Sequence, residues 1–499
     1  MRLLPRLPLL LLAAAAPAQV HYFPDGRPWR QRAASGPDQV VPGWFYNLGI
    51  TGIRVELVES APTHLVVRHV LEGSPADGRV EVGDHLIGAG GQRFRTPHQN
   101  GYGMQVFGPD GPIRDFATAL ERSLATAGGA LGHLALLIER GGEERTVELR
   151  LAAELGDYGP NYPFECAKSA RLLTDLLDWL LTQQREDGSF GSSPDNLFAP
   201  LAMLSSGESK YRQAVDRAAK FHARTTSARD HSSLINWRYT AAGIFLAEYY
   251  LATKAAWVKP ELQEVYDFLT HSQYTSKEQI NPKSYESHPH AVPKRPGQKE
   301  GGWGHNPGFE GYGPIAMVTG QAALALALIE RCGVDVDEAR ARAAYDFLAR
   351  GTGNNGYVWY GDEVAGHDSY ADMGRTGAAG LACWLSPWQG DFRDRALRHA
   401  RCIGAHPQSF PDTHGSPTMG MAFAALAANA DPASFRRLMD ANKWWFTLAR
   451  CADDGTFYYQ PNRDNAGYGG DSRRKPSAVV ALIFAIPQQN LAITGRSLR

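Results

Sequence analysis

The spacing of apolar positions changes character along the chain. Between residues 44 and 152, apolar residues form short runs and alternations, as in Leu65–Val67 and His133–Arg140, and this pattern predicts strands. Within that region, 115–126 repeats apolar residues at helical spacing. From Cys166 onward the pattern is one of helices and loops. The sequence therefore predicts a small β-rich domain at 44–152, a linker, and a large all-α domain at 160–490.

The helical part divides into six pairs of helices. The first helix of each pair is amphipathic, and these helices are expected near Ala167–Gln184, Tyr211–Thr225, Pro260–Ser272, Asp335–Arg350, Asp391–Ala405 and Asp431–Arg450. The second is apolar on nearly all faces, near Leu197–Leu204, Leu234–Ala252, Tyr312–Glu330, Gly374–Leu385, Ser416–Asn429 and Pro476–Ile486. A helix that is apolar all round is buried. We therefore expect an inner ring of buried helices inside an outer ring, an (α/α)6 toroid.

The loops that lead from outer to inner helices share a turn followed by an aromatic residue. They read Asp187-Gly188-Ser189-Phe190, Gly301-Gly302-Trp303, Asn355-Gly356-Tyr357 and Asp454-Gly455-Thr456-Phe457. Glycine permits the positive φ of the turn, and the aromatic side chain anchors the loop on the ring. All these loops enter N-termini of inner helices, so we expect them to meet at one mouth. Free amides and positive dipole ends at that mouth favour an anionic group.

This series of turns and helix pairs resembles the toroids of terpenoid cyclases and protein prenyltransferases, a fold that also occurs in polysaccharide lyases and glycosidases. The resemblance covers residues 160–490. The stretch from Asp368 to Asp372 lacks the Asp-x-Asp-Asp run of squalene cyclases. No Asp, Cys and His trio matches the prenyltransferase zinc site, and no Gly-Cys-Gly-Glu-Gln thioester run is present. We predict neither a metal nor a cofactor.

The β-rich part resembles a PDZ domain of the bacterial protease-associated kind. The resemblance is carried by Asn47-Leu48-Gly49-Ile50, Glu72-Gly73-Ser74-Pro75-Ala76 and Val82-Gly83-Asp84-His85-Leu86-Ile87. It implies that an extended peptide, the C-terminus of a partner, adds to a strand edge while loop amides hold its carboxylate. Leu48, Gly49 and Ile50 match that loop, and Leu120 would line the opposite wall. The alternative is a domain that only docks on its neighbour. This domain order is similar to an uncharacterised family of secreted bacterial proteins.

Candidate site residues are the polar and aromatic side chains collected at the mouth. The catalytic candidates are Asp362, His367, Asp368, Tyr370, Arg375 and His414. The candidates for substrate binding are Trp303, His305, Tyr312, Tyr357, Trp359 and Tyr458. Such groups can transfer protons, and aromatic faces can stack on sugars. Asp372 lies one turn before Thr376, so we expect it to cap the inner helix.

Two carbohydrate reactions fit these candidates. A glycoside hydrolase needs two carboxylates across the scissile bond, which could come from Glu310, Asp362, Glu363, Asp368 and Asp372. A lyase acting on uronic acids needs a base such as His or Tyr and a cation on the carboxylate, for which Arg375 is the candidate. A non-catalytic secreted binding or scaffold protein is the alternative, because loop Asp and His residues also cap helices. The possible partner at the toroid is thus a polysaccharide.

Composition adds two constraints. The 51 Lys and Arg residues balance 52 Asp and Glu residues, giving a net charge of -1, so no global field favours nucleic acid. The five cysteines are odd in number and unclustered, which argues against a disulfide framework; a single bridge between Cys402 and Cys451 stays open.

The N-terminus carries an export pattern. Arg2 and Arg6 precede the apolar run Leu9–Ala16, and Ala16-Pro17-Ala18 offers a cleavage site. We therefore predict a signal peptide at 1–18, an arm at 19–43 and a secreted or periplasmic protein. The apolar run is shorter than the roughly 18 residues that a membrane span requires, so we expect no stable membrane span.

Overall fold

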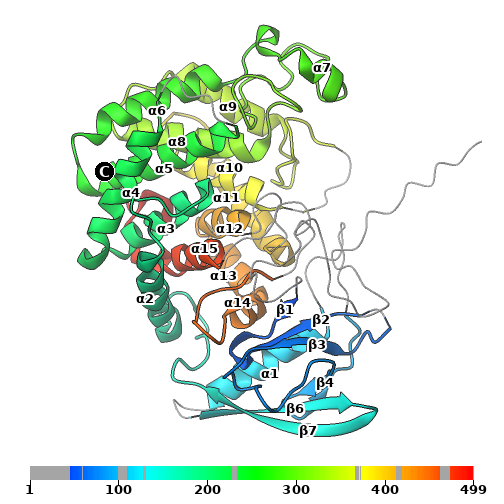
Figure 1. Cartoon of the computed structure of the whole chain (residues 1–499). Helices are drawn as coiled ribbons and strands as arrows, with labels where there is room; N and C mark the ends of the chain where they lie inside the picture. The colour runs from blue at the N-terminus through cyan, green and yellow to red at the C-terminus, as the bar shows by residue number, and fades with distance from the viewer. Residues whose placement is uncertain are drawn as a thin grey trace, which may run out of the picture.

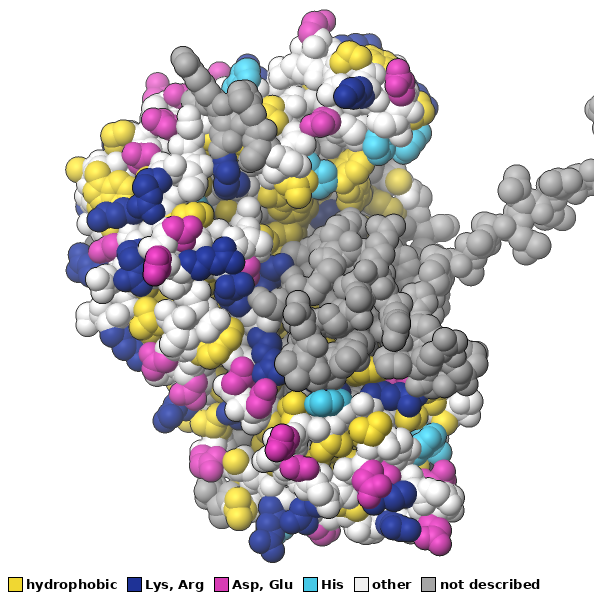
Figure 2. All heavy atoms as spheres, in the orientation of Figure 1, with side chains coloured by type: hydrophobic (Ala, Val, Ile, Leu, Met, Phe, Trp, Pro, Cys, Tyr) yellow, Lys and Arg dark blue, Asp and Glu magenta, His cyan; other side chains and the backbone are white. Residues whose placement is uncertain are grey.

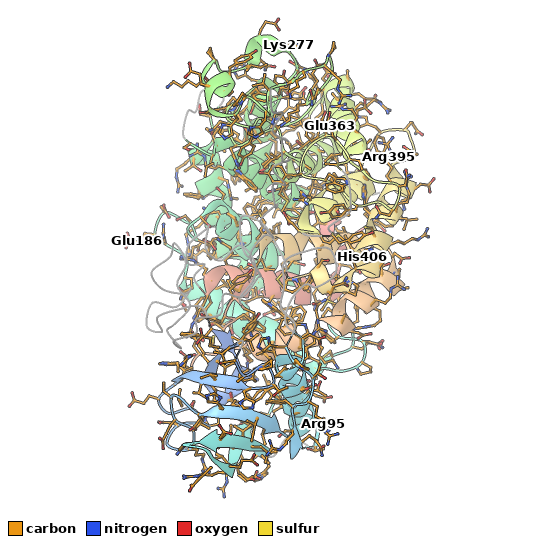
Figure 3. The ribbon with its side chains drawn as sticks, turned by 90° about the vertical axis from the view of Figure 1, so that its right-hand side faces the viewer. Arg95, Glu186, Lys277, Glu363, Arg395 and His406 are labelled. Atoms are coloured by element: carbon orange, nitrogen blue, oxygen red, sulfur yellow. The ribbon has the colours of Figure 1, made fainter. Side chains whose placement is uncertain are left out.

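The chain has two parts, which Figure 1 shows as a small sheet domain below a larger helical domain. The computed structural model describes residues 45–58, 60–98, 110–126, 131–227, 233–365, 370, 372–411, 418–460 and 473–497. We call residues 45–152 the sheet domain and residues 167–497 the helical domain. Figure 3, turned by 90°, places Arg95 at the sheet end and Lys277 at the opposite end. On the face in Figure 2, acidic and basic side chains are intermixed, as the net charge of -1 leads one to expect.

The sheet domain is one antiparallel sheet with a helix packed on it. Its strands are β1 (Tyr46–Asn47), β2 (Ile53–Glu56), β3 (Leu65–Val70), β4 (His85–Ala89), β5 (Gln92–Arg93), β6 (Leu131–Arg140) and β7 (Glu143–Ala152), in the order β1-β2-β3-β4-β6-β7 with β5 paired to β4. Helix α1 (Pro112–Thr126) packs on β4 and β6. Alternate residues of β6, such as Leu134 and Leu136, are buried against it. The alternation in His133–Arg140 therefore predicted strand β6 correctly.

The helical domain is a closed double ring. The inner helices are α3 (Ser193–Ser206), α5 (Ile235–Thr253), α8 (Ala316–Arg331), α10 (Gly374–Leu385), α12 (Met419–Ala428) and α15 (Arg474–Phe484). Each packs on the next, and α15 packs on α3. The outer helices are α2 (Ala167–Thr182), α4 (Arg212–Thr225), α6 (Val258–Ser272), α9 (Glu338–Arg350), α11 (Phe392–Ala405) and α13 (Pro432–Ala441). This closed contact cycle confirms the expected toroid.

Shorter elements join the rings. They are α7 (Lys283–Ser287), α14 (Lys443–Ala449) and the 3-10 turns η1 (Gly49–Thr51), η2 (Ser209–Tyr211), η3 (Lys277–Gln279), η4 (Pro407–Ser409), η5 (Ile486–Gln488) and η6 (Ala492–Thr494). The sequence predicted one outer helix over Asp431–Arg450, and this was wrong: it is divided into α13 and α14 at Asn442. The Asn442 side chain donates to the Leu438 and Pro407 carbonyls at 2.8 and 2.7 Å. An Asn side chain that bonds local carbonyls competes with helix continuation.

The glycine turns have a packing reason. Gly188, Gly301 and Gly356 have φ of 87°, 88° and 89°. A Cβ on each would lie under 3.0 Å from a carbonyl oxygen of the next outer helix, at Arg217, Ala343 and Arg398 respectively. Only glycine permits both the left-handed backbone and this approach. The aromatic residues that follow, Phe190, Trp303 and Tyr357, are fully buried.

A glutamine reinforces two of these turns. The Gln184 Nε2 donates to the Gly188 carbonyl at 3.0 Å and to a carbonyl of α4 at 2.8 Å. Gln273 repeats the arrangement, donating to Gly301 at 2.8 Å and to α9 at 3.0 Å. Each glutamine thereby ties a loop to the neighbouring outer helix.

Within the described residues, no helix is both long and apolar enough to span a bilayer. All five cysteines are buried, and none of them forms a disulfide. The structure therefore does not contain the Cys402–Cys451 bridge that the sequence left open.

A buried carboxyl group fastens the C-terminal segment to the inner ring. Glu248 of α5 is fully buried and accepts from the backbone N–H groups of Ala492 and Ile493 at 3.0 and 2.8 Å. Burial raises the pKa of Glu248 from 4.5 to about 7, although the two N–H bonds and the nearby Arg496 oppose this. A carboxyl whose pKa is raised on folding contributes stability that is present below its unfolded pKa. That contribution is lost as the pH rises through about 7.

We predict that Glu248→Gln removes this pH dependence, because the amide keeps an oxygen acceptor and does not titrate. From pH 5 to pH 8, the wild type should lose up to about 3 kcal/mol of unfolding free energy relative to the variant, at 1.36 kcal/mol per pKa unit. Denaturant unfolding across this pH range measures the difference. Parallel curves for the two proteins would contradict the prediction.

Candidate functional site

The N-terminal ends of all six inner helices surround one cavity of about 650 Å³. Its lining is Gly191, Ser192, Ser193, Pro194, Asn196, Phe221, His222, Ser233, Leu234, Trp237, Arg238, Ala241, His305, Tyr312, Ile315, Met317, Tyr360, Asp372, Arg375, Met419 and Lys475. The outer-to-inner loops therefore converge on one mouth, as their position in the sequence predicted.

The cavity is cationic. Among the described lining residues, Arg238, Arg375 and Lys475 carry positive charge and Asp372 is the one carboxylate. Partial burial lowers the pKa of Arg238, but an arginine stays protonated in proteins. The inner-helix N-termini add positive partial charge at the same place. The cavity is therefore suited to an anionic ligand.

Arg375, the second residue of α10, is held rigidly. Its side chain is buried, with 6% exposed. Nη2 donates to the Tyr357 hydroxyl at 2.9 Å, and Nε donates to the Val358 carbonyl at 3.3 Å. The Tyr360 ring centroid lies 5.7 Å from the guanidinium carbon. Such support fixes the orientation in which the guanidinium faces the cavity.

Asp372 differs from its expected role. The N-cap of α10 is Met373, without a side-chain cap bond, so the prediction that Asp372 caps this helix was wrong. Its carboxylate turns to Arg375, with Oδ2 3.5 Å from Nη1. Oδ1 has no hydrogen-bond partner within the described part of the chain. Asp372 and Tyr370 have φ of 53° and 50°, and left-handed non-glycine residues cluster at functional sites.

His305 and Tyr312 form a hydrogen-bonded pair on one wall of the cavity. The Trp237 Nε1 donates to His305 Nδ1 at 2.7 Å. Because an indole N–H can only donate, Nδ1 is the unprotonated nitrogen and Nε2 carries the hydrogen. Nε2 is hydrogen-bonded to the Tyr312 hydroxyl, so it donates to that oxygen. The hydroxyl proton of Tyr312 is then directed away from His305 and is available to a ligand.

His222 also borders the cavity but is neutral. Burial lowers its pKa to about 4. It lies within hydrogen-bond distance of the Asn196 carbonyl through Nε2, at 2.9 Å. Its part is to hold the start of α3 in place.

Two predicted site residues lie outside the cavity lining. Trp303 is fully buried and donates its Nε1 to the Leu269 carbonyl at 2.8 Å. Asp362 accepts from the Lys299 backbone N–H at 2.6 Å and from Arg350 at 3.2 Å. Both side chains anchor loops in this structure.

Other predicted residues lie beside or away from the cavity. The Tyr357 hydroxyl accepts from Arg375. The Trp359 and Tyr370 rings each lie 5.5 Å from the Tyr357 ring. Tyr458 lies under Arg54, 4.0 Å from the guanidinium carbon, at the junction of the two domains. His367, Asp368 and His414 lie outside the described residues.

The sequence reasoning missed two cavity residues, Trp237 and Lys475. Both occupy the first turn of an inner helix, α5 and α15. The rule that inner-helix N-termini meet at the mouth would have found them, had every first turn been included.

One group of side chains has the spacing of a metal site. Cys451, Asp453 and Asp454 offer ligand atoms within 4.8 Å of one another. However, Arg473 already pairs with both carboxylates, at 2.8 and 3.0 Å. Burial raises the pKa of the Cys451 thiol to about 12, which disfavours the thiolate that metals bind. The Arg473 guanidinium therefore neutralises these carboxylates in place of a metal ion.

Comparisons with known proteins define the family. The chain belongs to the family of DUF6288, a domain of unknown function, whose model matches residues 169–495. No curated protein matches the chain.

The solved structures that resemble this chain are remote in sequence. An inactive variant of the alpha-1,6-mannanase GH76A of Salegentibacter sp. HEL1_6, in complex with alpha-1,6-mannotriose, has 13% identity and a TM-score of 0.47, covering 64% of this chain and 99% of that one. The GH76 alpha-mannanase BT2949 of Bacteroides thetaiotaomicron has 10% identity and a TM-score of 0.47, covering 66% and 98%. A D-mannose isomerase has 9% identity and a TM-score of 0.41, covering 64% and 96%.

The strained backbone at Asp372 gives a testable prediction. Asp372→Gly and Asp372→Ala both remove the carboxylate, but only alanine keeps a Cβ in the left-handed conformation. The glycine variant should therefore be the more stable of the two by about 1 kcal/mol in denaturant unfolding. Equal stability, or a more stable alanine variant, would show that position 372 is not strained.

Proposed function

We propose that the helical domain is an exported polysaccharide lyase that acts on an acidic polysaccharide at the cavity. The observation that carries this proposal is a cavity with three cations, one carboxylate in an ion pair and a histidine–tyrosine pair on its wall. The export pattern of residues 1–18 supports a role outside the cytoplasm.

The cations support a uronate substrate. Arg375 lies at the start of α10, where its charge and the helix dipole add. A guanidinium binds a carboxylate through two parallel N–H bonds. Neutralising the uronate carboxylate makes the neighbouring C5 proton more acidic, because the negative charge that develops there is stabilised.

The aromatic residues support sugar binding. Trp237, Tyr312 and Tyr360 line the cavity with ring surface, and Trp237 stacks on His305 with centroids 5.8 Å apart. A cavity that combines aromatic walls with a few placed polar groups is typical of a ligand site.

The proton transfers are assigned to the His305–Tyr312 pair. A base removes the C5 proton, the electron pair forms the C4–C5 double bond, and the C4–O4 bond breaks. The departing O4 takes up a proton. Tyr312 acts as the base after its hydroxyl proton has passed to solvent, and the hydrogen bond from His305 Nε2 stabilises the phenolate. The same hydroxyl then returns the proton to O4, so no net proton is consumed.

Hydrolysis is the less favoured reaction. It needs two carboxylates across the bond, whereas Asp372 is the one carboxylate in the described lining. Asp362 and Glu363 are bonded to Arg350 and Arg295 respectively. The binding scaffold is the alternative without catalysis.

We predict that the purified chain, incubated with a panel of neutral and acidic polysaccharides, yields reducing ends together with the ultraviolet absorbance of an unsaturated uronate. Tyr312→Phe should lower the rate by a factor of about 10² to 10⁴, the range of general acid–base catalysis. Tyr285→Phe, on an exposed residue outside the cavity lining, is the matched control and should leave the rate unchanged.

Each other outcome has a distinct meaning. Reducing ends without absorbance would replace elimination by hydrolysis. A Tyr312→Phe variant with full activity would place the chemistry on other residues. Silence across the panel would favour the scaffold.

A further inference from the structure

The part of the sheet domain that resembles a peptide-binding groove lies against the helical domain. Helix α14 packs on α1, on η1 and on β1. A Cβ at Gly49 would lie 2.7 Å from the Thr447 carbonyl oxygen and 3.6 Å from the Leu448 Cα. Leu48 and Leu120 are fully buried. The turn expected to hold the carboxylate of a partner thus contacts the chain's own backbone.

The helix end is held by hydrogen bonds to Asn47. The Asn47 side chain donates to the Leu448 carbonyl at 2.7 Å and to the Arg450 carbonyl at 2.9 Å. Its backbone N–H donates to Gln460 Oε1 at 2.9 Å, and Gln460 Nε2 donates back to the Asn47 carbonyl at 3.0 Å. The Gln460 amide therefore makes the two bonds that one residue of an antiparallel strand would make.

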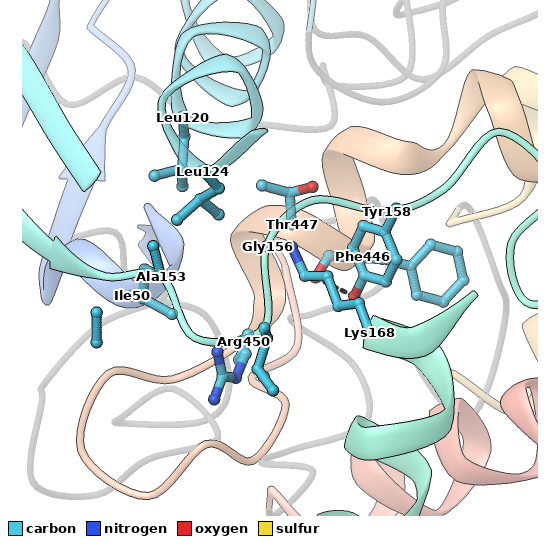
Figure 4. A pocket seen from close by; sticks show the side chains of 12 residues that line it. Ile50, Leu120, Leu124, Ala153, Gly156, Tyr158, Lys168, Phe446, Thr447 and Arg450 are labelled. Atoms are coloured by element: carbon cyan, nitrogen blue, oxygen red, sulfur yellow. Dashed lines mark hydrogen bonds between the residues drawn. The ribbon is translucent and has the colours of Figure 1, made fainter. Parts of the chain in front are cut away.

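A buried polar cluster closes the other side of the groove, and Figure 4 shows its members Tyr158, Lys168 and Thr447. Glu121 of α1 accepts from the Thr447 hydroxyl at 2.7 Å and from Lys168 at 3.2 Å, while its second oxygen accepts from the Tyr158 backbone N–H at 3.2 Å. Lys168 is 5% exposed, and its Nζ lies 4.2 Å from the Tyr158 ring centroid. The Glu121 carboxylate thus connects four segments of the chain by hydrogen bonds.

Little room is left between these groups. The remaining cavity, bordered by Ile50, Leu120, Thr447 and Lys168 among others, has a volume of about 10 Å³, at the lower limit for one water molecule. The outer edge of β2 is paired with β1, Tyr46 opposite Val55 and Asn47 opposite Arg54. The places where a peptide would add are therefore taken.

From these contacts we infer that the groove is an internal docking site whose ligand is residues 446–450 of the same chain. The sheet domain supports the toroid and does not bind the C-terminus of another protein. It holds Arg450, which forms a β-bridge with Phe457, and Gln460, which follows Phe457 in the chain. Helix α15, which carries Lys475 into the cavity, follows in the chain. This role is independent of the reaction proposed above.

The test compares two glycines of nearly equal backbone geometry. Gly49 and Gly78 have φ of 66° and 67°, but a Cβ at Gly78 would meet nothing within 4 Å. Both alanine variants carry the same backbone strain, and only Gly49→Ala also collides with Thr447. In the full chain, hydrogen exchange of the α14 amides should rise at least about tenfold in Gly49→Ala relative to Gly78→Ala, which corresponds to 1.4 kcal/mol. Equal exchange in the two variants would overturn the inference.

A second variant covers the case in which Gly49→Ala does not fold. Gln460→Glu keeps the shape and the acceptor but cannot donate to the Asn47 carbonyl. It should accelerate exchange at Asn47 and in α14 and leave the β6–β7 hairpin unchanged.

Titration of the wild-type chain with a library of labelled peptides with free C-termini completes the test. We expect no saturable binding. Saturable binding that Gly49→Ala abolishes and Gly78→Ala retains would instead establish an external peptide as the ligand.

Discussion

Three of the loops between the outer and inner rings depend on a contact between a glycine turn and the next outer helix. At Gly188, Gly301 and Gly356 the loop backbone lies so close to a helix carbonyl that a Cβ has no room. This approach sets the angle at which the chain passes from the outer to the inner ring. It recurs in the loops that lead into α3, α8 and α10, and it brings these three inner helices to the centre in the same direction. These three positions require glycine, because a Cβ would collide with the helix carbonyl.

That orientation determines the chemistry available at the mouth. Six helix N-termini surround one cavity, and three cationic side chains lie among them. These positive charges and the helix N-termini repel one another. The ion pair between Asp372 and Arg375 offsets part of this repulsion. An anionic ligand would offset the remaining repulsion. The strained backbone of Asp372, the buried Arg375 and the fixed tautomer of His305 all restrict motion, which is what a site requires to act on charge that develops in a transition state.

The two domains are joined by polar contacts that are expensive to break. Lys168 and Glu121 are almost buried and face each other across the junction. Removing one partner of a buried pair leaves an uncompensated charge, which costs about 3–5 kcal/mol. Burial lowers the pKa of Lys168, and Glu121 opposes this. The ion pair therefore fixes the sheet domain in one position on the helical domain.

The sequence by itself determined the order of the domains, the helix pairs and the convergence of their loops, because the period of apolar residues and the Gly-aromatic turns are local signals. It also identified His305, Tyr312 and Arg375, which face the cavity. It could not separate them from Trp303 and Asp362, which share their composition and loop positions but point into packed or ion-paired surroundings. The directions of the Trp303 and Asp362 side chains and the occupation of the groove by α14 are decided by contacts between residues far apart in sequence. Only the tertiary structure brings those residues together, since no local pattern encodes which distant backbone will lie beside them.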